Sequence, residues 1–318
     1  MSVATTAAPL APPSAFRRIL VQYPLAAYFV IAFFVTWILI LPMALGQGPN
    51  GLGILPFTVP DAGLLVLFIL PCFGPAVGAI LVTWAESGKA GVFQLLRRLV
   101  QWRVGIGWYL VAIFGALLIW LLGFTAAAGL TPFSNFFGQL PLVLSTFVPL
   151  LAFGLVIPSL GEEPGWRGFA LPRLQARYGP LLGTLILGTI HGLWHLPSFF
   201  TPFAAPFTLG NFLGFVAAIM GASFFWTWIY NNTKGSLLIA LLVHSAFNAA
   251  SGVLNLNAII PQDLAYAGWV QTIGGGAWLN AVAFGAAGLL VIVLTRGRLS
   301  YQPSPPALVP MPEVAPAQ

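Results

Sequence analysis

Two adjacent acidic residues, Glu162 and Glu163, stand in the stretch GEEPGWRGF at positions 161–169, and Arg167 follows Glu163 by four residues. The whole chain has six acidic residues, so a third of them lie at this one place. A carboxylate in an apolar cavity can remove a proton from water, and an arginine on the same helix face can keep a neighbouring carboxylate ionised. The pair therefore predicts general-base chemistry. The alternative is an interfacial ion pair that makes one helix end less costly to bury.

The chain contains three histidines, and all of them fall within long apolar runs. His191 and His195 are four residues apart, as are His244 and Asn248, so each pair shares one face of a helix. Ionisable groups inside a bilayer are costly and usually mark functional sites, although a histidine taken alone is more often an interhelical hydrogen bonder. Together with the glutamates these side chains suit amide hydrolysis, which needs a base for water and donors for the oxyanion.

The composition is that of a membrane protein. Hydrophobic residues make up 59% of the 318 residues and charged residues 6%, against about 25% charged residues in soluble domains. The net charge of +6 comes from basic residues scattered singly or in pairs between apolar runs. A nucleic-acid-binding surface needs such residues concentrated on one polar face, so we expect no nucleic-acid partner. The single cysteine, Cys72, excludes an intrachain disulfide and a metal cluster of several cysteines.

Eight apolar stretches are long enough to span a bilayer core, which takes about 20 residues per helix. They are Pro24–Leu45, Ala62–Trp84, Trp108–Ala128, Leu142–Leu160, Pro180–Phe200, Phe212–Ile229, Ser236–Leu254 and Trp278–Leu294. The sequence therefore predicts an all-α, polytopic membrane protein with about eight transmembrane helices. We expect it to be a multi-pass protein of a prokaryotic cell membrane.

With eight spans, all twelve lysines and arginines fall on one side of the membrane. Short cytoplasmic loops accumulate such residues, so both termini are predicted to be cytoplasmic and GEEPGWRGF to lie at the cytoplasmic end of the fourth span. The predicted organisation is a disordered tail at 1–22, three spans at 23–140, a catalytic helical domain at 141–255, a loop and last span at 256–298, and a Pro-rich disordered tail at 299–318.

The motifs EEPGWR, HGLWHLP and HSAFN together resemble the CPBP group of intramembrane endopeptidases, which includes type II CAAX prenyl proteases and bacteriocin-processing and self-immunity proteins. The family pattern is EExxxR, FxxxH and HxxxN, and the resemblance covers residues 142–254. It implies that the first glutamate and the second-motif histidine activate water, and that the third-motif histidine and asparagine stabilise the oxyanion. The site residues that it implies are Glu162, Glu163, Arg167, His195, His244 and Asn248. The implied partner is a membrane-associated or lipidated peptide in the lipid bilayer.

The sequence departs from the family pattern at His191, which stands where an aromatic residue is expected. The resulting HxxxH pair could hold a divalent metal such as zinc, with Glu162 as the third ligand. Equally, an imidazole ring can fill the slot of an aromatic ring, and we favour this interpretation, with His195 as the working histidine. The family was long described as metalloproteases, so a metal is an open expectation.

The depth of the site is a second difficulty. If the fifth span begins at Pro180, His195 lies about 22 Å along the helix, far from a glutamate at the cytoplasmic edge. A broken backbone near Pro158, Gly161 and Pro164 would let the glutamate motif sit deeper, provided that it lines a cavity.

Two other functions stay open on sequence grounds. A proton-coupled transporter also has interrupted helices with histidine and glutamate near the membrane midplane, although the chain has no self-similar halves. A non-catalytic membrane scaffold, such as an immunity protein, would keep the fold without turnover.

Overall fold

The computed structural model describes residues 14–254, 256, 258–260 and 276–303. Every regular element in this part of the chain is helical, and seven helical runs are long and apolar enough to cross a membrane. They are α2 (Pro24–Leu45), Asp61–Val100, α5 (Ile106–Ala128), Leu140–Phe200, α10 (Leu209–Asn232), α11 (Leu237–Leu254) and α14 (Gly276–Leu294). The prediction of an all-α, multi-pass membrane protein is confirmed.

Shorter elements lie within these runs and between them. The run Asp61–Val100 contains α3 (Asp61–Ile69), the turn η1 (Leu70–Phe73), α4 (Gly74–Leu96) and the turn η2 (Arg97–Val100), with a kink at Gly88. Two short helices, α1 (Ala15–Gln22) and α6 (Thr131–Gly138), lie outside the seven runs. The prediction that residues 15–22 belong to a disordered tail is wrong, since they form α1. At the other end, residues 299–303 of the predicted disordered tail are also ordered, since Leu299 is buried and its carbonyl oxygen accepts a hydrogen bond from Asn231. Residues 1–13 and 304–318 lie outside the described residues.

The run Leu140–Phe200 is a hairpin that holds both the fourth and the fifth predicted span. Its first arm comprises α7 (Leu140–Gly154), the π-helical turn η3 (Leu155–Ser159), α8 (Leu160–Glu163) and the π-helical turn η4 (Pro164–Ala170), and it continues into α9 (Leu171–Trp194). The chain turns at Gly179, whose φ of 76° is readily adopted by glycine, and the second arm ends with the turn η5 (Leu196–Phe200). The eight predicted spans therefore agree with the seven observed runs, because one run, Leu140–Phe200, contains two of the spans.

The glutamate motif lies inside the first arm of this hairpin, so its predicted position at the end of the fourth span is wrong. The helix continues for another 15 residues beyond Glu163 before it reaches Gly179. Glu162 and His195 stand 17 and 16 positions from that turn, or about 25 Å each at a rise of 1.5 Å per residue. The two residues consequently meet at one level of the bundle, which resolves the depth difficulty without a break in the helix.

Close backbone packing holds the motif against η1, the turn that precedes α4. A Cβ atom on Gly161 would lie 2.5 Å from the carbonyl oxygen of Cys72, so only glycine fits there without movement of the backbone. Pro158 and Pro164 lie in the two π-helical turns, and proline has no N–H to donate to the helical ladder. The irregular backbone is tolerated because neighbouring helices surround it.

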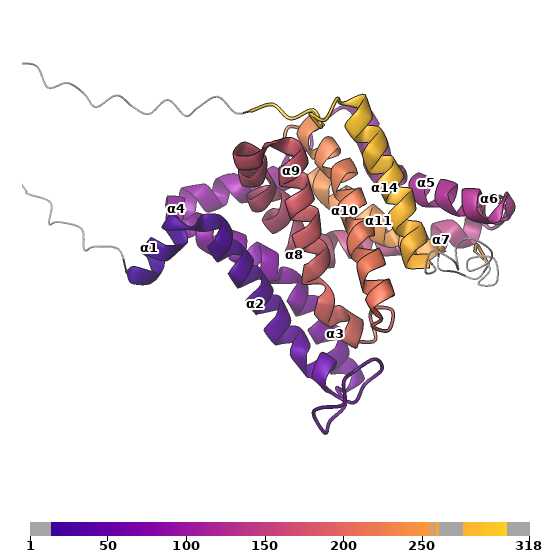
Figure 1. Cartoon of the computed structure of the whole chain (residues 1–318), viewed down its shortest axis with the longest axis horizontal. Helices are drawn as coiled ribbons and strands as arrows, with labels where there is room; N and C mark the ends of the chain where they lie inside the picture. Colours follow the sequence, from indigo (N-terminus) through magenta and orange to yellow (C-terminus); the bar gives the residue numbers. More distant parts are fainter. Residues whose placement is uncertain (1–13, 255, 257, 261–275, 304–318) are drawn as a thin grey trace, which may run out of the picture.

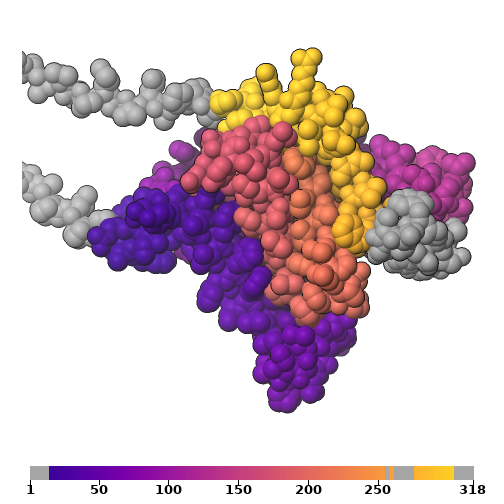
Figure 2. Space-filling view, in the orientation of Figure 1, coloured from indigo at the N-terminus to yellow at the C-terminus, as the bar shows by residue number. Residues whose placement is uncertain are grey.

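The apolar core lies on both sides of the hairpin. One cluster, which includes Trp120, Phe247 and Phe284, joins α5, α11 and α14, and a second, which includes Tyr28 and Trp166, joins α2 to the motif. Figure 1 shows α2 and α4 on one side of α8–α11, with α5 and α14 on the other. In the space-filling view of Figure 2, the central segment (salmon and orange) stays visible between the N-terminal helices (indigo) and α14 (yellow).

The two described ends of the chain, α1 and the segment after α14, lie towards the same end of the bundle in Figure 1. This arrangement fits an even number of crossings. The cytoplasmic location of that end stays a prediction.

Candidate active site

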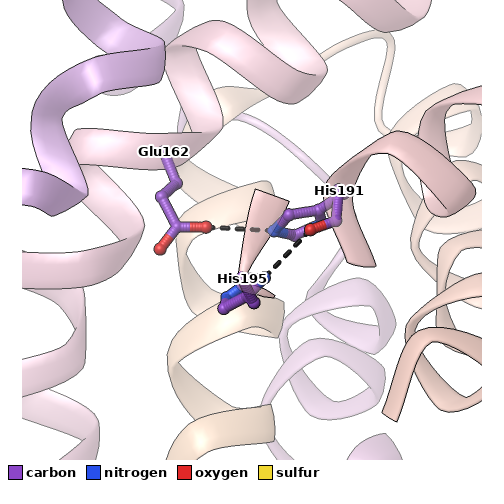
Figure 3. Close-up of side chains that lie close together, drawn as sticks. All are labelled: Glu162, His191 and His195. Carbon is purple, nitrogen blue, oxygen red and sulfur yellow. Dashed lines mark hydrogen bonds and ion pairs between the residues drawn. The ribbon is translucent and has the colours of Figure 1, made fainter. Parts of the chain in front are cut away.

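Three helical segments bring the polar motif residues together inside the bundle. Glu162 lies in α8, His191 in the last turn of α9, His195 at the C-cap of α9, and His244 in α11. Glu162, His191 and His244 are 3%, 1% and 5% exposed. Figure 3 shows the Glu162 carboxylate turned towards the rings of His191 and His195. The three motifs therefore form one buried site.

Glu162 is the carboxylate that faces the histidines. Its Oε2 accepts hydrogen bonds from the indole Nε1 of Trp166 at 3.3 Å and from Nε2 of His191 at 3.1 Å. Nε2 of His244 lies 4.0 Å from the same oxygen. Its buried carboxylate thus has three nitrogen groups of the protein as close neighbours.

Glu163 has a different set of partners. Its Oε1 accepts a hydrogen bond from Nη1 of Arg167 at 2.8 Å and one from Nδ1 of His244 at 2.7 Å. The predicted i, i+4 pair of Glu163 and Arg167 is confirmed, and both side chains are 1% exposed. This buried ion pair orients His244 through Nδ1 and leaves its Nε2 directed towards Glu162.

His195 is oriented by the backbone. Its Nδ1 lies 2.9 Å from the carbonyl oxygen of His191, which can only accept, so Nδ1 carries the proton. In the neutral ring Nε2 then has a free lone pair and can accept a proton or bind a cation.

A large cavity opens next to these side chains. Its volume is about 890 Å³. Four predicted site residues are part of its described lining: Glu162, His195, His244 and Asn248. His191 also lines the cavity, whereas Glu163 and Arg167 do not. The rest of the wall is largely apolar, with Phe68, Phe153, Phe203 and Phe247 among its residues. The cavity can therefore admit an apolar chain to a polar centre.

The structure brings all six predicted site residues to one region, with four on the cavity wall and two behind it. His191 is an addition, because its Nε2 contacts Glu162 while its ring also packs 4.9 Å from the ring of Trp166. The HxxxH spacing was the sequence signal for this residue. Trp226 of α10 stacks on His244, and the motif spacing gave no signal for it.

The donor set of this site fits a divalent metal ion. Glu162, His191 and His195 each offer one ligand atom, and these atoms lie within 4.8 Å of one another. Two histidines and one glutamate are a ligand set found in catalytic zinc sites. Moreover, His195 donates its other ring N–H to a backbone carbonyl, as metal-bound histidines usually do.

Comparison with known proteins places the motifs in one family segment. Residues 144–250 match the family described as type II CAAX prenyl endopeptidase Rce1-like, and this segment contains all the predicted site residues. Over 107 residues the chain is 31% identical to the CAAX prenyl protease 2 of Methanococcus maripaludis. That match covers 32% of this chain and 39% of the relative, so the chain spans well under two thirds of the relative's length. The resemblance to the CAAX protease group is confirmed over the matched segment.

Proposed function

Because residues 144–250 of this membrane protein match the type II CAAX prenyl endopeptidase Rce1-like family, we propose that the chain is an intramembrane endopeptidase. The observation that carries this proposal is the position of Glu162, a buried carboxylate on a largely apolar cavity, with three imidazole rings around it. Such a carboxylate is suited to remove a proton from water in a site from which bulk water is excluded.

The proposed reaction begins with one water molecule between Glu162, His191 and His195, whose ligand atoms are close enough for a single water to reach all three. Glu162 removes one proton from that water while Nε2 of His195 accepts a hydrogen bond from the other, and the water oxygen attacks the carbonyl carbon of the peptide. The C–N bond then breaks, and Glu162 returns the proton to the leaving amine nitrogen. The products are a new carboxyl group and a new amine.

The developing oxyanion needs hydrogen-bond donors on the opposite side of the carbonyl carbon. His244 and Asn248 are four residues apart on α11, and both line the cavity. With protons on both ring nitrogens, His244 donates from Nδ1 to Glu163 and from Nε2 to the oxyanion. In this proposal Glu163 and Arg167 hold His244 and do not touch the substrate.

The same three residues are also suited to hold a divalent ion, which would be an alternative to the metal-free reaction. Glu162, His191 and His195 would hold it, and His191 would give up the proton that its Nε2 now donates to Glu162. The ion would polarise the substrate carbonyl and make a bound water more acidic.

The proposed substrate is a membrane-associated or lipidated peptide. The similarity to a CAAX prenyl protease supports a lipidated C-terminal segment. The cavity supports the same class, because its wall is mostly apolar and its polar groups gather around Glu162.

A liposome assay separates this function from transport and from a scaffold role. Purified protein is reconstituted with a pH-sensitive dye inside the vesicles and supplied with a library of membrane-proximal peptides, some of them prenylated. We expect peptide cleavage without proton flux, and loss of cleavage in Glu162→Gln. Proton flux without cleavage by the wild-type protein would support a transporter. The absence of both activities would support a scaffold.

A further inference from the structure

Trp226 lies against the site although it belongs to α10, a helix that carries none of the three motifs. It is 2% exposed. The Cζ atom of Arg167 lies 4.5 Å from its ring centroid, and the ring of His244 stacks on it with centroids 5.5 Å apart and planes inclined by 20°. One indole ring therefore contacts both groups that bond to Glu163.

The buried guanidinium of Arg167 depends on this ring. Its Nη1 bonds to Glu163, but its Nε and Nη2 have no hydrogen-bond partner in the part of the chain that the structure describes. Buried charged groups are costly when their donors are unpaired. The face of an indole ring attracts a cation, and this attraction strengthens where water is excluded. Trp226 thus compensates for the hydrogen bonds that Arg167 lacks.

The same contacts fix the position of His244. Arg167 and His244 both donate to one oxygen, Oε1 of Glu163. The two bonds, at 2.8 and 2.7 Å, require that the guanidinium plane of Arg167 and the imidazole plane of His244 keep their orientations. On the basis of the proposed function, we propose that Trp226 is a positioning residue, whose ring face holds Arg167 and His244 at Glu163 and so directs Nε2 of His244 towards Glu162.

The ring face, and not the indole N–H, carries this role. Trp226 Nε1 has no hydrogen-bond partner among the described residues. A phenyl ring keeps an aromatic face at this position, whereas a leucine side chain fills part of the volume without one. The proposal therefore predicts different effects for Trp226→Phe and Trp226→Leu.

The kinetic test compares Trp226→Phe with Trp226→Leu in the peptide cleavage assay. We expect Trp226→Phe to keep kcat within about threefold of wild type, and Trp226→Leu to lower kcat by about a hundredfold with little change in KM, as expected when an oxyanion donor is misplaced. Trp226 also lines the cavity, so a change confined to KM would show that it contacts substrate and would overturn the proposal. Equal kcat values for both variants would overturn it as well.

Trp228→Leu is the matched control, because Trp228 lies on the same helix but packs against Trp108, away from the glutamates. It should leave kcat near the wild-type value. The double variant Glu163→Gln/Trp226→Leu should lose no more activity than the more severe single variant, since both act through His244. Additive losses would mean that Trp226 acts independently of Glu163.

A spectroscopic measurement tests the positioning without turnover. The chain has three histidines, so protein labelled with ¹⁵N-histidine gives few ring signals. Trp226→Leu should shift the His244 signals and leave those of His195 unchanged, because the rings packed against His195 are His191, Trp194 and Phe215. Unchanged His244 signals in folded protein would overturn the proposal. If the wild-type protein cleaves no peptide, the proposed function fails, and this measurement still decides the role of Trp226.

Discussion

At the scale of single residues, the two adjacent glutamates have different partners because of helix geometry. Neighbouring residues on a helix point about 100° apart, so Glu162 and Glu163 cannot share a face. The spacing of Glu163 and Arg167 was enough to predict their ion pair. The hydrogen bond from His244 to Glu163 joins residues 81 positions apart, and no local spacing in one sequence reveals such a contact.

The two histidines of α9 give a prediction at this scale. His191→Phe keeps a ring beside Trp166 but loses the hydrogen bond to Glu162, so we expect kcat to fall about tenfold without abolition of activity. His195→Phe removes the free nitrogen lone pair and should lower kcat at least about a hundredfold. Kinetics of both variants, measured with and without a chelator, provide the check.

A metal mechanism predicts a different pattern for the same variants. Both phenylalanine substitutions would then be equally harmful, bound metal would be lost, and zinc would restore chelated wild-type protein. That result would contradict the assignment of His195 as the dominant histidine.

At the scale of helices, the apolar runs predicted the spans well, but the position of the motif was wrong. Pro164 and Gly165 usually signal the end of a helix. Here π-helical turns carry the helix through them, because the polar side chains of the motif find partners inside the protein rather than in water. Whether a helix ends at a proline or continues through it depends on tertiary contacts, and a local sequence pattern does not contain these contacts.

Gly161→Ala tests the close packing of the motif helix on η1, the turn that precedes α4. The added Cβ atom would meet the backbone of Cys72 at 2.5 Å, so we expect a loss of about 1–3 kcal/mol in stability, seen as a lower midpoint of thermal unfolding in detergent. Gly107→Ala is the control, because its Cβ atom meets nothing within 4 Å and alanine favours the α5 helix. Equal midpoints for the two variants would contradict the packing argument.

At the scale of the whole molecule, the distribution of basic residues predicts the orientation in the membrane. The two described ends of the chain share one end of the bundle, while the loop 46–60 follows α2 at its other end. Composition and charge thus predicted the class of protein, but the side of the membrane rests on the positive-inside rule alone.

Cysteine labelling in intact cells checks this orientation. In a Cys72→Ala background, cysteines that replace Lys89 and Lys234 should be shielded from an impermeant thiol reagent, and a cysteine that replaces the half-exposed Leu52 should react. Lysis before labelling should expose all three positions and serves as the control. Reaction at Lys89 but not at Leu52 in intact cells would invert the orientation.

The central claim is that Glu162 activates the water that hydrolyses the peptide, and cleavage in H₂¹⁸O tests it most directly. Wild-type protein in liposomes should release a fragment whose new carboxyl group carries one ¹⁸O atom, as mass spectrometry can detect. Glu162→Gln should lower the rate at least about a hundredfold. Glu86→Gln, which alters a carboxylate paired with Arg173 away from the cavity, should cleave at the wild-type rate. Cleavage by folded Glu162→Gln at the wild-type rate, with ¹⁸O incorporated, would contradict the account.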